Sequence, residues 1–225
     1  MSVRLTGTMS SAALRVPRHW IVWTVVLFAA TFALGFAAKA LPALRAATLD
    51  DTINRAHAHT LDDIARLLDK LDKPVVVAVI LAVVFVVLLL VRGWRLALGV
   101  CAVTGLGWIT TLIVKAVVAQ PRPSTAGLVH PLHVSPATLS YPSGHVVFAT
   151  ALVTALVLIC RRPLARTVVL VVGALFVLLV AWSRLYVGVH YVTDVVGAVL
   201  NGVAGVLLFA GLWNLLAARL FARRV

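Results

Sequence analysis

The sequence predicts an all-α integral membrane protein, a single domain over residues 1–225 that forms a bundle of six transmembrane helices. Hydrophobic residues make up 62% of the chain and its mean hydropathy is +1.07, which excludes an ordinary soluble domain. Its apolar stretches are also close to the roughly 17–25 residues that a helix needs to cross a bilayer. The predicted spans are residues 20–38, 74–91, 96–114, 143–160, 167–182 and 190–216.

The first span, residues 20–38, is expected to stay in the membrane rather than to be removed as a signal peptide. Its apolar run is longer than the central region of a secretory signal, and no small-residue cleavage site clearly follows it.

Residues 42–73 are the one sizeable polar segment and hold six of the seven acidic residues. Leucine and isoleucine recur among its charged residues, which predicts an amphipathic helix at the extracytoplasmic interface. The segment is either a solvated connector over the bundle or a lid at a substrate site. His57 and His59 within it are expected to be surface residues rather than metal ligands.

Basic residues gather at alternate breaks between the spans and at both ends of the chain. Eleven of them fall on one side of the six-span arrangement: Arg4, Arg15, Arg18, Arg92, Arg95, Arg161, Arg162, Arg166, Arg219, Arg223 and Arg224. The positive-inside rule makes this side cytoplasmic, together with both termini. The net charge of +13 thus reflects orientation in the plasma membrane, and its distribution argues against nucleic-acid binding.

The loop at residues 120–141 is rich in proline, which prevents a continuous helix. Non-helical backbone this close to the bilayer must lie outside the hydrocarbon or line a cavity, so this loop is expected to form a wall or roof of a site. Its His130 and His133 could bind zinc together with His145, but surface histidines are the more ordinary interpretation.

Three short segments are the candidates for chemistry. The first runs from Lys115 to Arg122 and Pro123, at the outer end of the third span. Lysine supplies a mobile charge, and arginine supplies a planar fork that binds phosphate oxygens. Taken alone this segment is a weak signal, because basic residues often flank a membrane helix as interface anchors.

The second segment is Tyr141-Pro142-Ser143-Gly144-His145, at the start of the fourth span. Proline followed by Ser-Gly predicts a helix that begins with free backbone amides and a hydroxyl cap, and such a start binds anions. His145 would then reach the same anion. The alternative is a capped helix start with a histidine at the membrane interface.

The third segment runs from Ser183 and Arg184 to Asp194. Asp194 stands alone in an apolar stretch, and a lone carboxylate in a membrane segment by default marks a functional site. It follows His190 by four residues, so one helical turn would put both side chains on one face. Asp194 can then orient the imidazole and leave its other nitrogen as nucleophile or base. The alternative is a buried pair that holds two helices together.

The predicted topology brings the three segments to one membrane face, since each lies at an outward end of a span. One aspartate then faces three cations, Lys115, Arg122 and Arg184. This balance predicts an anion site and argues against Zn²⁺ or Mg²⁺, which would need several carboxylates or neutral ligands. No metal or other cofactor is predicted.

The patterns Lys-x6-Arg-Pro, Pro-Ser-Gly-His and Ser-Arg-x5-His-x3-Asp together resemble the three-part signature of the type 2 phosphatidic acid phosphatase family, in its bacterial membrane branch. Every signature position is matched between Lys115 and Asp194, which makes residues 115–194 the catalytic signature of a phosphatase domain. The first third of the chain lies outside the signature.

The resemblance implies that His190 attacks phosphorus and forms a phosphohistidine, while Asp194 orients the ring. It implies that His145 protonates the leaving oxygen and later activates water. The phosphoryl oxygens would be held by Lys115, Arg122, Ser143, Gly144 and Arg184.

The expected activity is metal-independent hydrolysis of a membrane lipid phosphate at the extracytoplasmic surface. Polyprenyl diphosphate, phosphatidylglycerol phosphate and phosphatidic acid are the candidate substrates. One alternative is a phosphotransferase that passes the phosphohistidine to an alcohol or lipid. Another is a transporter or lipid-binding protein that holds an anion without chemistry. A haloperoxidase is disfavoured because the spans leave no soluble vanadate-binding domain.

Overall fold

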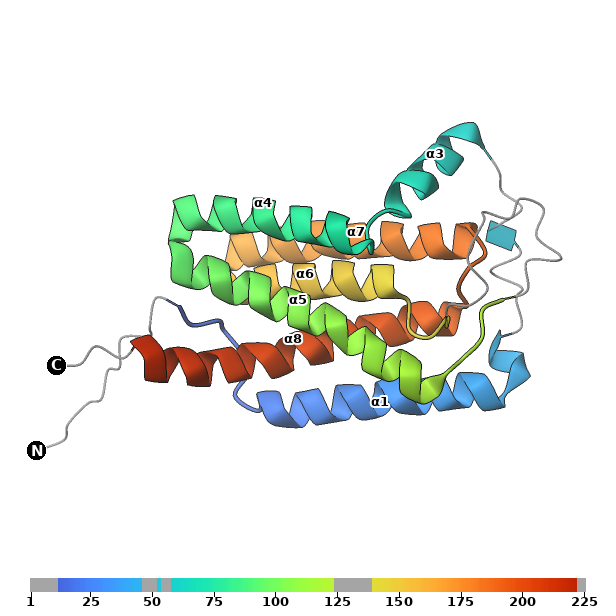
Figure 1. Ribbon diagram of the computed structural model, residues 1–225, viewed down its shortest axis with the longest axis horizontal. Coiled ribbons are helices and arrows are strands. Elements are labelled where there is room, and N and C mark those ends of the chain that lie inside the picture. Colours follow the sequence, from blue (N-terminus) through green and yellow to red (C-terminus); the bar gives the residue numbers. More distant parts are fainter. Residues whose placement is uncertain (1–11, 46–51, 54–57, 124–138, 222–225) are drawn as a thin grey trace, which may run out of the picture.

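The computed structural model describes residues 12–45, 52–53, 58–123 and 139–221, and the regular elements in these ranges are all helices (Figure 1). The long helices are α1 (Trp20–Ala40), α4 (Pro74–Arg92), α5 (Trp94–Val118), α6 (Gly144–Ile159), α7 (Pro163–Tyr186) and α8 (Val192–Phe221). Between α1 and α4 lie the short 3₁₀ helix η1 (Pro42–Arg45) and the helix α3 (His59–Leu68).

Within the described ranges, five helices are long and apolar enough to cross a bilayer: α1, α4, α5, α7 and α8. Helix α6 is also apolar but has 16 residues. At a rise of about 1.5 Å per residue it is shorter than a hydrocarbon core of about 30 Å. The predicted all-α membrane fold is confirmed, and the count of six spans stays a prediction.

Helices α8 and α5 form the centre of the bundle. About half of the apolar stretch of each is buried inside the protein, 56% in α8 and 50% in α5, compared with 11% in α4 and 17% in α7. The outer helices expose large apolar side chains such as Leu90 and Leu164, as a surface in contact with lipid requires. Glycines let the central helices approach closely, since a Cβ built on Gly205 would lie 2.9 Å from the Cα of Gly107.

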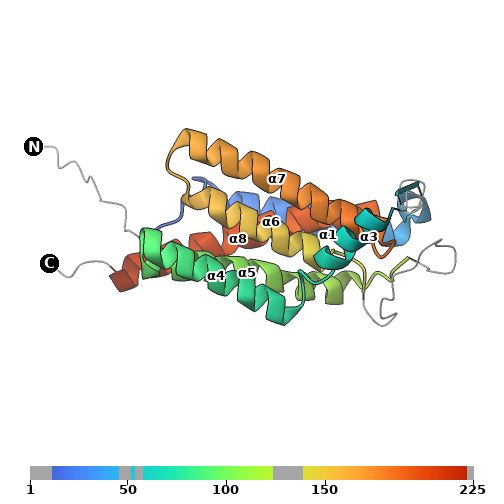
Figure 2. The ribbon, with the colours of Figure 1, turned by 90° about the horizontal axis from the view of Figure 1, so that it is seen from above.

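Successive long helices run in opposite directions, which brings one set of helix ends together (Figures 1 and 2). The C-terminal ends of α1, α5 and α7 and the starts of α4, α6 and α8 lie at the same end of the bundle. The start of α1 and the end of α8 lie at the opposite end, where the Trp20 ring packs on Gly211. The alternation therefore gathers the three predicted motifs.

Helix α3 covers the end where the motifs meet, packed against α7 (Figure 1). It buries Ala65 and Leu68 and leaves Leu67 exposed, as an amphipathic helix does. His59 begins this helix, whereas His57 lies outside the described residues. The polar segment thus contributes a helix that touches the bundle close to the candidate site.

Several helix boundaries differ from the sequence prediction, and those at the end of α7 and the start of α8 change the setting of predicted site residues. Helix α7 continues to Tyr186 rather than ending at residue 182, so Arg184 lies in its last turn. Helix α8 begins at Val192, so His190 precedes it in a turn that includes Gly188 with φ 72°. The loss of hydrophobicity at Arg184 does not end the helix, because this arginine is buried between helices rather than solvated.

Candidate active site

His190 and Asp194 form a buried pair at the turn between α7 and α8. The Nδ1 atom of His190 lies 3.2 Å from Oδ2 of Asp194. The backbone N–H of Tyr191 donates to the same oxygen at 3.0 Å, and the amide Nε2 of Gln120 donates to Oδ1 at 2.9 Å. Both carboxylate oxygens are therefore paired, which offsets the cost of burying this charge.

The predicted contact between His190 and Asp194 exists, but one helical turn does not make it. Only Asp194 lies in α8, and the turn before the helix folds the imidazole back onto the carboxylate. Burial lowers the pKa of His190 well below its ordinary value, and the charges of Arg122 and Lys115 act in the same direction. The ring is therefore neutral at pH 7. With its Nδ1 proton held by Asp194, Nε2 carries the lone pair.

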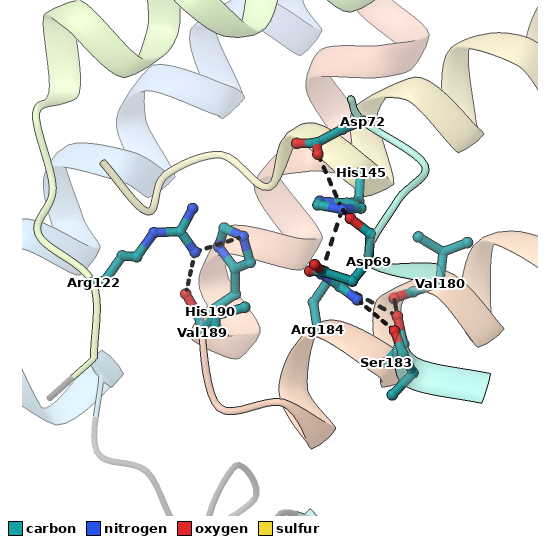
Figure 3. A network of polar contacts seen from close by, with 10 residues as sticks. Asp69, Asp72, Arg122, His145, Val180, Ser183, Arg184, Val189 and His190 are labelled. Atoms are coloured by element: carbon teal, nitrogen blue, oxygen red, sulfur yellow. Dashed lines mark hydrogen bonds and ion pairs between the residues drawn. The ribbon is translucent and has the colours of Figure 1, made fainter. Parts of the chain in front are cut away.

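Arg122 lies beside the His190 ring, on the side of Nε2 (Figure 3). Its Nη1 atom is 3.5 Å from Nε2 of His190 and donates to the carbonyl of Val189 at 3.0 Å. Lys115, one turn before the end of α5, donates from Nζ to the carbonyl of Leu139 at 2.7 Å. Two of the three predicted cations thus face the same end of the bundle as the imidazole.

Arg184 and His145 form the other half of the cluster. Nη1 of Arg184 lies 3.4 Å from Nε2 of His145, and the guanidinium is almost fully buried. His145 lies in the first turn of α6, as predicted. The first and third motifs therefore meet at His190, while the second and third meet at Arg184.

Two carboxylates from the polar segment also enter the cluster, and we call Asp69 and Asp72 the acidic pair (Figure 3). Oδ1 of Asp69 accepts from Nη1 of Arg184 at 2.6 Å, and Oδ1 of Asp72 lies 3.1 Å from Nε2 of His145. The expectation that one aspartate faces three cations is therefore wrong, because three aspartates do. The sequence pattern did not reveal this, since the acidic residues of this segment read as a solvated face.

Ser143 and Gly144 lie at the start of α6, beside the start of α8. The backbone N–H of Ser143 donates to the carbonyl of Asp194 at 3.2 Å, which ties the two helix starts together. Ser143 is the N-cap residue, but its hydroxyl does not cap the helix as predicted. That hydroxyl is fully buried and has no hydrogen-bond partner among the described residues, so it is available to a ligand.

Gln120 is a site residue that the motif analysis missed. It is fully buried and reaches Asp194 from the segment between Lys115 and Arg122. The available signal was a polar side chain inside a motif that already had two cations. Its contact with a residue 74 positions later depends on the path of the chain and has no local pattern.

A cavity of about 290 Å³ opens beside the cluster, between the start of α4 and the middle of α5. Its lining is mostly apolar, and Lys115, Asp72 and Gly144 also belong to it. The apolar part includes Ile109 and Leu112, which are exposed on the outer face of the bundle. The lining residues are Asp72, Pro74, Trp108, Ile109, Thr111, Leu112, Lys115 and Gly144.

Within the described ranges, no group of three or more His, Cys, Asp or Glu side chains is arranged to hold a metal ion. His130 and His133, the partners considered for a zinc site with His145, lie outside the described residues. The absence of a metal cofactor stays a prediction.

Comparison with known proteins gives matches over the part of the chain that holds this cluster. Residues 93–217, more than half of the chain, match the family model described as the PAP2 superfamily. Phosphatidylglycerophosphatase B of Bacillus subtilis is 34% identical over 90 residues, which are 38% of this chain and 42% of that protein. Undecaprenyl-diphosphatase BcrC of the same organism is 35% identical over 97 residues, which are 43% of this chain and 47% of that protein.

The chain therefore spans less than half the length of these two curated relatives. A structural likeness extends further. The crystal structure of a transmembrane PAP2-type phosphatidylglycerolphosphate phosphatase from Bacillus subtilis superimposes with a TM-score of 0.67. It covers 84% of this chain and 94% of its own, at 23% sequence identity, so the likeness is one of fold.

Proposed function

Because the chain belongs to the PAP2 superfamily, we propose that it is a membrane lipid phosphatase that works through a phosphohistidine and without a metal ion. One observation carries the proposal. The neutral His190 is held by Asp194 through Nδ1, and its Nε2 lone pair faces the guanidinium of Arg122. A nucleophile beside a fixed cation is the arrangement that phosphoryl transfer to histidine requires.

The proposed reaction has two steps. Nε2 of His190 attacks phosphorus, the bond between phosphorus and the leaving oxygen breaks, and His145 gives a proton to that oxygen. His145 then takes a proton from a water molecule, whose oxygen attacks the phosphohistidine and frees His190 and inorganic phosphate. Asp194 stabilises the charge that the His190 ring gains in the first step.

The phosphoryl oxygens would be held by Lys115, Arg122 and Arg184, with the Ser143 hydroxyl and the Gly144 amide. Phosphoryl transfer spreads negative charge over these oxygens, so catalysis depends mainly on positioning and on fixed positive charge. The buried and unpaired Ser143 hydroxyl supports this role, since a phosphoryl oxygen would supply its missing partner.

We also propose an orientation in the plasma membrane, in which the site faces the extracytoplasmic side and both termini are cytoplasmic. It is supported by arginines that flank the helix ends opposite the site, where the positive-inside rule expects them. Those in the described ranges are Arg15, Arg18, Arg92, Arg95, Arg161, Arg162, Arg166 and Arg219. The substrate would be a lipid phosphate of the bilayer whose tail lies along the apolar lining of the cavity.

Purified protein in detergent is expected to release inorganic phosphate from lipid phosphates in the presence of EDTA, because fixed cations take the role of a metal. Phosphatidylglycerol phosphate, phosphatidic acid and a polyprenyl diphosphate form the test set. Vanadate, which mimics the pentacoordinate phosphoryl group, is expected to inhibit fully at saturation. Activity that persists in saturating vanadate, or that needs an added metal, would contradict the proposed site.

Replacing Gln120 with leucine is expected to lower kcat about five- to twentyfold, because one hydrogen bond to the Asp194 carboxylate is lost. KM is expected to change little, since the Gln120 amide donates to Ser140 and Asp194 and has no assigned role in holding the phosphoryl oxygens. Steady-state kinetics of phosphate release over a range of lipid phosphate concentrations separate the two constants.

Asn214 provides the matched control for Gln120. It is an amide that bonds the backbone of Leu14 at the opposite end of the bundle. Asn214→Leu is expected to lower thermal stability and leave kcat unchanged. A Gln120→Leu protein that loses stability in the same way but keeps its kcat would show that Gln120 has only a structural role.

A further inference from the structure

The acidic pair, Asp69 and Asp72, lies in the connection between α3 and α4 and points into the cluster (Figure 3). Neither residue belongs to the segment that matches the family model, which begins at residue 93. Both contact groups to which the proposed function gives a role. Asp69 pairs with the Arg184 guanidinium, and Asp72 pairs with His145.

The contacts of His145 show which part of a substrate Asp72 would meet. Nε2 of His145 is 3.4 Å from Arg184, 3.0 Å from the carbonyl of Asp69 and 3.1 Å from the carboxylate of Asp72. This nitrogen is therefore the one that contacts both the Arg184 guanidinium and the acidic pair. On the proposed function it protonates the leaving oxygen, so whatever is bonded to that oxygen lies beside Asp72.

The cavity leads to the same carboxylate. Asp72 lines it together with Lys115 and Gly144. A Cβ built on Gly144 would be 2.8 Å from Oδ2 of Asp72, so the carboxylate abuts the start of α6. A lipid tail lying in the cavity would therefore have the Asp72 carboxylate among its neighbours.

The acidic pair is anchored to the bundle. Nη2 of Arg184 donates to the carbonyl of Ala65 at 3.3 Å, and Ala65 is fully buried in a cluster with Tyr186 and Val187. Lys73 is the N-cap residue of α4, directly after Asp72. The carboxylates are thus held from both sides and form a fixed part of the leaving-group side.

Charge then separates two classes of substrate. Three carboxylates stand against the three cations, so the site has no large excess of positive charge. When a lipid monophosphate reacts, the group that leaves beside Asp72 is an uncharged alcohol. A lipid diphosphate places a second charged phosphoryl group there, and two negative charges at this distance repel each other appreciably in a partly buried site.

We propose that Asp72, supported by Asp69, is a specificity-determining residue that selects lipid monophosphates over lipid diphosphates. The inference rests on the proposed function, because it uses His145 as the group that protonates the leaving oxygen. It deepens that function by assigning a substrate class: phosphate monoesters whose leaving group is an alcohol.

The test compares two substrates that share one chain, farnesyl monophosphate and farnesyl diphosphate. The first phosphate released from each is measured by chromatography, and kcat/KM is determined for both. The unaltered protein is expected to favour the monophosphate. Asp72→Asn is expected to shift the ratio toward the diphosphate by at least about tenfold, because the repelling charge is removed and the side-chain shape is kept.

Asp63→Asn is the matched control. It removes one charge from α3, the helix before the acidic pair, but Asp63 is exposed and pairs only weakly with Arg66, at 3.8 Å. Its substrate ratio is expected to equal that of the unaltered protein. An equal shift in this variant would mean that net charge, rather than the position of Asp72, sets the ratio, and would overturn the inference.

If Asp72→Asn abolishes turnover, equilibrium binding to the same variants still tests the inference. The affinities of methylphosphonate and methylenediphosphonate are measured by calorimetry on the same variants, and the same shift of at least about tenfold toward the diphosphonate is expected. An unchanged ratio in both assays overturns the inference. If the unaltered protein releases phosphate from neither farnesyl substrate nor from phosphatidylglycerol phosphate or phosphatidic acid, the proposed function fails. The binding ratio alone then decides whether Asp72 selects against a second phosphoryl group.

Discussion

Replacing His190 with alanine is expected to abolish phosphate release, with a fall in kcat of about four orders of magnitude or more. Asp194 holds the imidazole through Nδ1, and its Nε2 lies 3.5 Å from the guanidinium of Arg122. Without it, no covalent intermediate forms, and water would have to attack phosphorus directly. The measurement is steady-state phosphate release, joined to trapping of an acid-labile phosphoenzyme with a ³²P-labelled lipid phosphate.

His19 is the control for this substitution, because it is an exposed histidine at the start of α1, at the far end of the bundle. His19→Ala is expected to keep both turnover and the labelled intermediate. Turnover in the His190→Ala protein would contradict the assignment of the nucleophile. Turnover without any acid-labile label in the unaltered protein would contradict the covalent mechanism itself.

Asp194→Asn is expected to lower kcat by about three to four orders of magnitude, while the affinity for vanadate falls far less. An amide would present an N–H group to Nδ1 of His190 or to the N–H groups of Tyr191 and Gln120, which now donate to the carboxylate. The ring would then lose the tautomer that leaves Nε2 unprotonated. The cations that hold the phosphoryl oxygens stay in place, so binding of the anion survives.

The comparison of kcat with the vanadate inhibition constant checks this prediction. Asn201 offers a control, because it is a buried polar residue farther along α8 whose amide donates to Thr110 at 3.0 Å. Asn201→Leu is expected to lower stability without changing the relation between turnover and vanadate affinity. An Asp194→Asn protein that binds vanadate poorly yet turns over normally would refute the positioning role.

Much of this cluster could be predicted from the sequence because its parts are marked locally. A lone aspartate in an apolar stretch and basic residues at the outward ends of spans are visible in the order of the residues. Alternating helix direction then brings such ends together without further information. The structure accordingly brings Arg122 next to His190 and Arg184 next to His145.

The acidic pair and Gln120 could not be predicted in this way. Asp69 meets an arginine 115 positions later, and Gln120 meets an aspartate 74 positions later. Neither contact follows from periodicity or motif spacing, because both depend on how α3 and the segment after α5 cross the end of the bundle. The end of α7 was misjudged for a related reason: a buried polar residue such as Arg184 looks like a solvated one in a hydropathy pattern.

The sequence by itself determined the all-α membrane fold and the end of the bundle at which the motifs meet. Apolar length and alternation act along the chain, so the order of residues is enough to specify them. Only the tertiary structure decided the charge balance of the site. It did so because an electrostatic interaction depends on distance in space, and Asp69 and Asp72 stand within about 3 Å of Arg184 and His145 through the packing of α3 on α7.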